Sequence, residues 1–155
     1  MEHRARENLK NRWIELGAHV LGDNPPTAGR EVRRREWEEV FLMLERLYSQ
    51  EHRFYHNLEH INDCLRLFDS LNESNRNLVQ NPLSLELAIW FHDAVYTPGN
   101  SKNEEESALL AEKTLAGGGL SDRTVSETAE LILCTDYASQ LSVRTRDCSC
   151  MRDID

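Results

Sequence analysis

The hydrophobic positions of the chain repeat with the spacing of helices. Near the N-terminus, apolar residues recur three or four positions apart, at Leu9, Trp13, Leu16 and Val20. This spacing is typical of one face of an α-helix. Residues 22–26 contain two prolines and predict the end of that helix, because proline has no N–H and a fixed φ. No stretch alternates convincingly between polar and apolar residues, so the pattern predicts an all-α chain.

A second helix is predicted to begin near Thr27 or Gly29. Its inward positions are expected to be Val32, Trp37, Val40, Phe41, Leu44 and Leu47. Four more helices follow from the same reasoning, at about residues 57–71, 83–93, 103–115 and 121–135. The fourth of these six helices is apolar on most sides, so we expect it to lie at the centre of the fold.

Segments between and at the ends of the helices give further expectations. Residues 72–82 are predicted to form a polar loop. Ser101 or Asn103 is expected to cap the fifth helix. The tail from residue 137 has weak periodicity. A bundle of about six helices is therefore the predicted fold.

Composition narrows the class of protein. A length of 155 residues predicts one domain, with N-terminal helices over residues 1–47 and the remaining helices over residues 48–155. The formal net charge of −9 disfavours nucleic acid as a partner, because phosphates attract Lys and Arg. The N-terminus does not resemble a signal peptide, and no apolar run is long enough to span a membrane.

The four cysteines do not suggest a zinc knuckle. Cys148 and Cys150 stand one residue too close for the usual pair. Without a secretory signal, we interpret Cys64, Cys134, Cys148 and Cys150 as reduced thiols of a cytoplasmic protein.

Two histidines at helical spacing are the first candidate for chemistry. His56 and His60 are four residues apart, so a helix would place both rings on one face. Imidazole is a common ligand of divalent transition metals. A pair of surface or capping histidines is the alternative.

His92 and Asp93 are the second candidate. They follow the most apolar segment of the chain, so both are expected at the inner end of the core. A buried aspartate needs a partner, and a metal ion is one such partner. An arginine paired with Asp93 is the alternative. Two histidine-bearing helices can pack as neighbours in a bundle and share a metal ion.

Three segments in this order resemble the HD superfamily of predicted metal-dependent phosphohydrolases. They are YHNLEHI at residues 55–61, FHDAVYTP at residues 91–98 and NEEESA at residues 103–108. The first is also similar to the histidine motif of cyclic-nucleotide phosphodiesterases. The resemblance covers about residues 48–155, the metal-site core, and implies an HD-like helical bundle. Members of the family continue with a further helix or more past the position of Asp155, so this chain is either a fragment or has an unusual end.

The resemblance also implies roles for individual residues. His56 would be the general acid, and the metal ligands would be His60, His92, Asp93 and Asp155. Asp153 is the second choice for the last ligand. Glu104 would orient water or a ligand, although it also suits a first helical turn as an ordinary glutamate.

The implied activity is metal-assisted hydrolysis of a phosphate ester of a nucleotide or another small phosphorylated metabolite. The cofactor would be one or two divalent ions of Mn, Ni, Co, Fe, Zn or Mg. Arg53 and Lys102 are candidate phosphate contacts, or else ordinary surface charges. The alternative is a catalytically impaired module that binds a nucleotide or a partner. That alternative is favoured by the chain's end at Asp155 and by the lack of a histidine shortly after Thr135.

Overall fold

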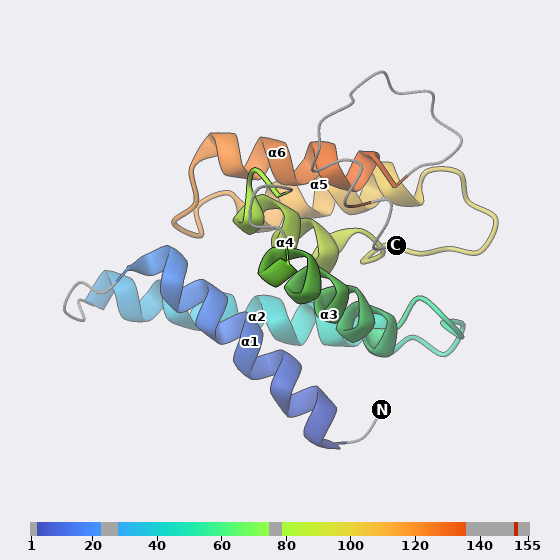
Figure 1. The fold of residues 1–155 in the computed structure, drawn as a ribbon, viewed down its shortest axis with the longest axis horizontal. Helices are drawn as coiled ribbons and strands as arrows, with labels where there is room; N and C mark the ends of the chain where they lie inside the picture. The colour runs from blue at the N-terminus through green and yellow to red at the C-terminus, as the bar shows by residue number, and fades with distance from the viewer. Residues whose placement is uncertain (1–2, 23–27, 75–78, 136–150, 152–155) are drawn as a thin grey trace.

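The protein is all-α in the part of the chain that the structure describes. A computed structural model describes residues 3–22, 28–74, 79–135 and Met151, with only the backbone for residues 72–74. These residues form six helices and no strand (Figure 1). The helices are α1 His3–Leu21, α2 Ala28–Tyr48, α3 Leu58–Ser74, α4 Pro82–Phe91, α5 Asn103–Leu115 and α6 Asp122–Leu133. The predicted bundle of about six helices is therefore confirmed.

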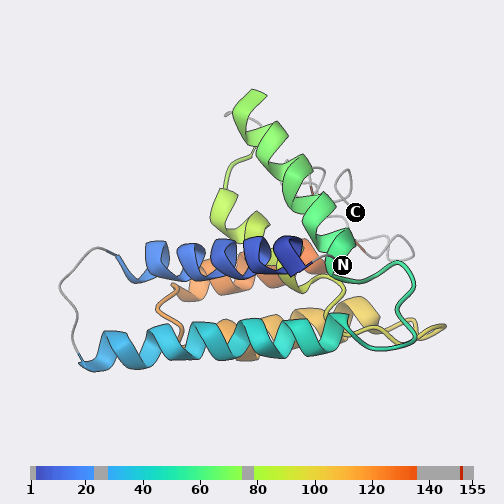
Figure 2. The same cartoon turned by 90° about the horizontal axis from the view of Figure 1, so that it is seen from below.

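The first two helices form an antiparallel pair around three tryptophan rings. α1 and α2 lie side by side, and α3 runs at a steep angle to both (Figure 2). The indole N–H of Trp13 donates to the carbonyl of Trp37 at 2.8 Å, and both residues are buried. The Trp13 ring also packs edge-on against Trp90 of α4, with 5.3 Å between centroids. Such edge-to-face contacts add to the stabilisation that burial of the rings supplies.

α4 is the central helix, as its apolar sequence predicts. It packs against α3, α5 and α6. Its residues from Leu87 to Phe91 are all buried, so the end of the helix is fixed from every side. α4 has ten residues, and none of the helices in the described ranges has both the length and the hydrophobicity of a membrane span.

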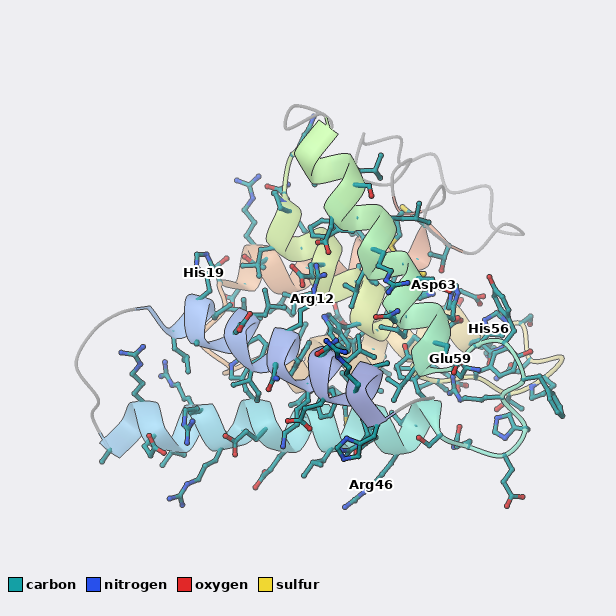
Figure 3. All side chains as sticks on the ribbon, turned by 60° about the horizontal axis from the view of Figure 1, so that its bottom comes forward. Arg12, His19, Arg46, His56, Glu59 and Asp63 are labelled. Carbon is teal, nitrogen blue, oxygen red and sulfur yellow. The ribbon has the colours of Figure 1, made fainter. Side chains whose placement is uncertain are left out.

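Arg12 connects three helices at the edge of this core. Its guanidinium pairs with Asp69 of α3 at 2.7 Å and with Glu86 of α4 at 2.7 Å. In Figure 3, Arg12 lies on α1 where that helix passes α3. Arg12 is partly exposed, so solvent weakens these pairs, and their main contribution is to orient α3 against α1.

Several local predictions differ from the structure. Val32 is 55% exposed, so α2 turns its inward face only from Trp37 onward. α3 continues to Ser74, past the predicted end at residue 71, whereas α4 ends at Phe91 and not at Asp93. Lys102, and neither Ser101 nor Asn103, is the N-cap of α5. The sequence shows which polar residues lie near the start of the helix, but it does not show which of them hydrogen-bonds to a residue elsewhere in the chain.

The cysteines also differ from their prediction. Cys134 takes part in a disulfide bond, so the prediction of a reduced thiol is wrong for Cys134. Cys64 is buried in α3 as a thiol. Cys148 and Cys150 lie outside the described residues.

The contact between α1 and α2 can be tested at Gly17. A Cβ atom at this position would lie 2.6 Å from Cδ2 of Trp37, well inside van der Waals contact. We expect Gly17→Ala to lower the free energy of unfolding by about 1–2 kcal/mol, because overpacking exceeds the gain in helix propensity. Urea denaturation followed by circular dichroism measures the change.

Gly29→Ala is the matched control. Gly29 also lies in a helix, but a Cβ atom there would meet nothing within 4 Å. This variant should be neutral or more stable by up to about 1 kcal/mol. Equal urea midpoints for the two variants would show that the Trp37 ring moves aside without a loss of stability.

Candidate metal centre

The first turn of α3 presents His60 to the core. The side chain of Asn57 accepts hydrogen bonds from the backbone N–H groups of Glu59 at 2.8 Å and His60 at 3.3 Å. This cap satisfies donors that the start of a helix leaves unpaired. The helix begins at Leu58, so His60 lies within its first turn and is buried.

His56 precedes the helix and does not belong to it, contrary to the prediction. It lies in the turn before Leu58. Figure 3 places His56 and Glu59 at the same end of α3. The side chain of His56 is 31% exposed, compared with 4% for that of His60. The two histidines therefore differ in environment although they are four residues apart.

The end of α4 presents His92 with a defined tautomer. The backbone N–H of His92 donates to the carbonyl of Ala88 at 2.8 Å, which extends the last helical turn. Its ring Nδ1 lies 2.8 Å from the carbonyl oxygen of Ile89. A carbonyl oxygen only accepts, so Nδ1 carries a proton and Nε2 is the nitrogen that a metal ion could bind. This is the arrangement that metal-binding histidines use to orient the ring.

Asp93 brings a carboxylate to the same point. Its Oδ2 atom lies 3.3 Å from Nε2 of His92 and 3.7 Å from Nε2 of His60. The two Nε2 atoms are 3.2 Å apart. Three ligand-type atoms from the start of α3 and the end of α4 thus form a compact triangle. The structure brings together His60, His92 and Asp93, the three ligands predicted on the described residues.

These separations fit a divalent metal ion. Bonds of about 2.0–2.2 Å to nitrogen and oxygen place the ligands of a tetrahedral ion roughly 3.3–3.5 Å apart. The observed edges of 3.2, 3.3 and 3.7 Å are close to that range. All three side chains are at least 86% buried, since the most exposed of them, Asp93, is 14% exposed. Two imidazoles and a carboxylate are a common donor set for zinc and other transition metals.

His56 makes a different kind of contact with Asp93. Its Nδ1 atom lies 2.6 Å from Oδ2 of Asp93. That distance is too short for two ligands of one ion and is the distance of a charge-assisted hydrogen bond. Nδ1–H therefore donates to the carboxylate. His56 belongs to a group that could hold a metal together with His60 and Asp93, but its short bond to Asp93 favours a role beside the ion.

Cys64 also reaches the cluster, and sequence reasoning missed it. It lies one helical turn after His60, with its Sγ atom 3.6 Å from Nε2 of His60. His60, Cys64 and His92 form a second group that could hold a metal. The spacing of His60 and Cys64, four residues apart on one predicted helix, is the signal that could have revealed it.

Arg53 holds the two halves of the site together. Its Nη1 atom donates to the carbonyls of His56 at 3.0 Å and Asp93 at 2.6 Å, and its Nη2 atom donates to the carbonyl of Ala94 at 2.9 Å. The residue is 6% exposed, so it is not the surface charge that the sequence suggested. Burial lowers the pKa of the guanidinium, while nearby Tyr48, Asp93 and Tyr96 raise it.

Asn103 and Ser107 fix the loop that follows Asp93. The amide of Asn103 accepts from the N–H of Thr97 at 2.9 Å and donates to the carbonyl of the same residue at 3.1 Å. The hydroxyl of Ser107 makes the equivalent pair of bonds with Val95, at 3.0 and 3.2 Å. The segment at residues 103–108 therefore acts on the site through the main chain.

The other predicted residues lie away from the cluster or outside the described chain. Glu104 is partly exposed on the first turn of α5 and belongs to neither ligand group of the described residues. Lys102 is exposed beside it. Asp153 and Asp155 lie outside the described residues. The catalytic role of Glu104 and the ligand role of Asp155 stay predictions.

Comparison with known proteins adds no relative to this picture: no family model, curated protein or solved structure matches the chain. The geometry of the cluster and the sequence resemblance are therefore the two indications of function.

Removal of Arg53 tests how far the site depends on its hydrogen bonds. Arg53→Ala leaves three main-chain carbonyls without their hydrogen-bond donor. Each carbonyl that water does not reach costs about 1–3 kcal/mol. We expect the free energy of unfolding to fall by about 3 kcal/mol, measured by urea denaturation. Arg123→Ala is the control, because Arg123 pairs only with Glu127 on the surface of α6 among the described residues. Equal midpoints for the two variants would contradict the role of Arg53.

Proposed function

We propose that this protein is a metal-dependent phosphohydrolase whose ion is held by His60, His92 and Asp93. The observation that supports it best is the triangle of buried ligand atoms, with edges of 3.2, 3.3 and 3.7 Å, beside a partly exposed histidine. Structural zinc sites are usually closed by four protein ligands, whereas catalytic sites leave a position open. The three ligands of the triangle leave such a position.

The chemistry follows from the donor set and from His56. A divalent ion in this site would polarise a phosphoryl oxygen and acidify water at neutral pH. His56 donates from Nδ1 to Asp93, so its Nε2–H remains for transfer to a departing oxygen when the ring carries both protons. The hydrogen bond from Nδ1–H to the carboxylate of Asp93 orients the ring, as an aspartate does for catalytic histidines in other enzymes. His56 is thus the general acid of the proposal.

The substrate would be a small phosphate ester, such as a nucleotide or another phosphorylated metabolite. The net charge of −9 repels anions at long range, so the ion itself must supply local attraction for the phosphate. Exposed Lys102, in the loop after the ligands, is a further candidate for phosphate contact. The sequence resemblance suggests the class of reaction, and the cluster contains the metal ligands and the general acid that such a reaction would need.

The metal centre is tested by removing its ligands. Protein purified without chelator should contain close to one equivalent of a transition metal by elemental analysis. We expect His92→Ala and Asp93→Ala to lose most of this metal and to lose hydrolysis of phosphate monoesters assayed with manganese, nickel and cobalt. His52→Ala is the control, because the ring of His52 bonds the carbonyl of Tyr96 at 2.9 Å and belongs to neither ligand group.

Two outcomes would argue against the enzyme. Wild-type protein without bound metal, and without activation by added metal, would contradict the whole proposal. Bound metal without turnover across a broad panel of phosphate esters would favour the module that binds a nucleotide or a partner.

The division between acid and ligand has its own test at His56. His56→Ala should keep its metal and lower kcat about a hundred- to ten-thousand-fold, the usual contribution of a general acid. His60→Ala should lose the metal. If the two variants lost metal to the same extent, His56 would be a ligand and the proposed acid would be wrong.

A further inference from the structure

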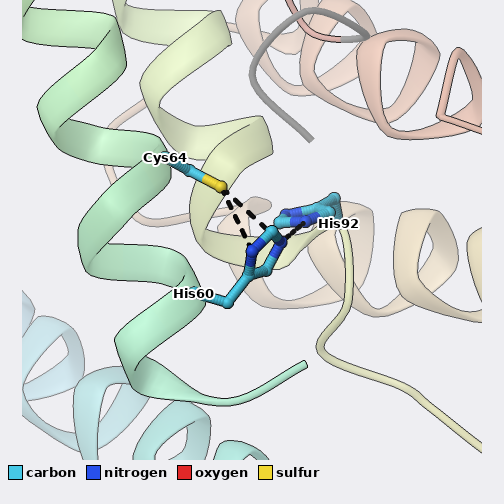
Figure 4. A group of neighbouring side chains, drawn as sticks. All are labelled: His60, Cys64 and His92. Carbon is cyan, nitrogen blue, oxygen red and sulfur yellow. Dashed lines mark hydrogen bonds between the residues drawn. The ribbon is translucent and has the colours of Figure 1, made fainter. Parts of the chain in front are cut away.

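Cys64 lies at the inner side of the candidate metal centre. It follows His60 by one turn of α3 and is 1% exposed. Its Sγ atom lies 3.6 Å from Nε2 and 3.8 Å from Nδ1 of His60. Figure 4 shows the sulfur of Cys64 pointing from α3 toward the ring of His60. The ring of His92 lies next to the Nε2 atom of His60.

Two of the separations match those of ligands on one ion. An ion with bonds of about 2.3 Å to sulfur and about 2.0–2.1 Å to nitrogen places tetrahedral sulfur and nitrogen ligands roughly 3.6 Å apart. Two nitrogens on the same ion lie roughly 3.3 Å apart. The corresponding distances here are 3.6 Å from Cys64 to His60 and 3.2 Å from His60 to His92.

A buried cysteine is often a small hydrophobic residue, and Cys64 does lie within the core. Here, however, its sulfur faces two buried imidazoles as well as apolar side chains. The Nδ1 atom of His92 bonds the carbonyl of Ile89, so Nε2 is the ring nitrogen that faces His60 and Asp93. These neighbours favour a ligand over a packing residue.

We propose that Cys64 is a thiolate ligand of this centre, joining His60 and His92. The inference rests on the proposed metal centre and adds sulfur to its donor set. As the sulfur–metal bond forms, the thiol proton is released to solvent. The described residues would then supply two imidazoles, a carboxylate and a thiolate, and water or substrate would bind at a fifth coordination position.

A thiolate changes which metals the site selects. Sulfur favours zinc, cobalt and iron, whereas magnesium and manganese favour oxygen ligands. The proposal therefore narrows the metal from the six candidates of the sequence to the softer ones. It also predicts that Cys64 contributes more to metal affinity than His56 does, because His56 hydrogen-bonds the carboxylate of Asp93.

Cobalt(II) titration of the full chain tests the proposal. Cobalt bound to a thiolate gives a near-ultraviolet sulfur-to-metal charge-transfer band in addition to its visible bands. We expect wild-type protein to develop both at one equivalent of cobalt. Cys64→Ser should bind cobalt through the remaining ligands, with visible bands but without the charge-transfer band. Its zinc affinity should fall by at least the roughly 10–100-fold that loss of an outer-shell partner costs.

Two variants make the result specific. Cys64→Ser retains the other cysteines of the chain, of which Cys134 is disulfide-bonded, so a band that persists in it comes from a thiolate other than Cys64 and overturns the proposal. His19→Ala removes an exposed histidine at the end of α1, and it should retain the band and the affinity of the wild type. Circular dichroism checks that each variant keeps its helices.

The outcomes separate this inference from the proposed function. Cobalt bound at one equivalent without a charge-transfer band would overturn the thiolate ligand alone. Absence of cobalt binding by folded wild-type protein would overturn both. A charge-transfer band lost in Cys64→Ser, with cobalt still bound, would support both the centre and its sulfur ligand.

Discussion

The guanidinium of Arg53 binds main-chain carbonyls on both sides of the candidate site. The carbonyl of His56 stands just before α3, and those of Asp93 and Ala94 stand just after α4. Removing a guanidinium from water is costly, and here charge-assisted hydrogen bonds and stacking on the rings of Tyr48 and Tyr96 offset that cost. Because one rigid planar group holds both segments, the distance between the start of α3 and the end of α4 is fixed. The spacing of His60 from His92 depends on it.

The rest of the scaffold supports the same two points. α4 is buried on every side by α3, α5 and α6, so its last turn cannot move without disturbing the core. Asn103 and Ser107 of α5 hold the loop after Asp93 through paired bonds to its backbone. Tyr48, whose pKa burial raises, remains protonated and donates its hydroxyl to the carbonyl of Trp90. Ligands placed on rigid elements in this way need little rearrangement to meet an ion.

Hydrophobic spacing was enough to predict the helices and the central place of α4, because burial of an apolar face is a property of the local sequence. Adjacency of His60 to His92 and Asp93 was also predictable, since both segments border that core. The carbonyl partners of Arg53 could not be predicted, because hydrogen bonds from a side chain to distant carbonyls leave no periodic pattern in the sequence. The predicted inward position of Val32 was wrong for a related reason: whether a helix turn is covered depends on what packs against it, as Trp13 covers Trp37.

The two histidines of the first motif show how local structure divides a repeated residue into two roles. A continuous helix would have given His56 and His60 equivalent positions on one face. Instead, α3 begins between them, and the Asn57 cap marks the boundary. His60 is directed into the buried triangle by the helix, whereas His56, in the preceding turn, reaches Asp93 from the solvent side of the cluster with its side chain 31% exposed. One carboxylate oxygen thus lies between a buried imidazole at 3.7 Å and a partly exposed imidazole at 2.6 Å. The longer distance suits a shared cation and the shorter one suits a shared proton, so the start of a helix is what separates the proposed ligand from the proposed acid.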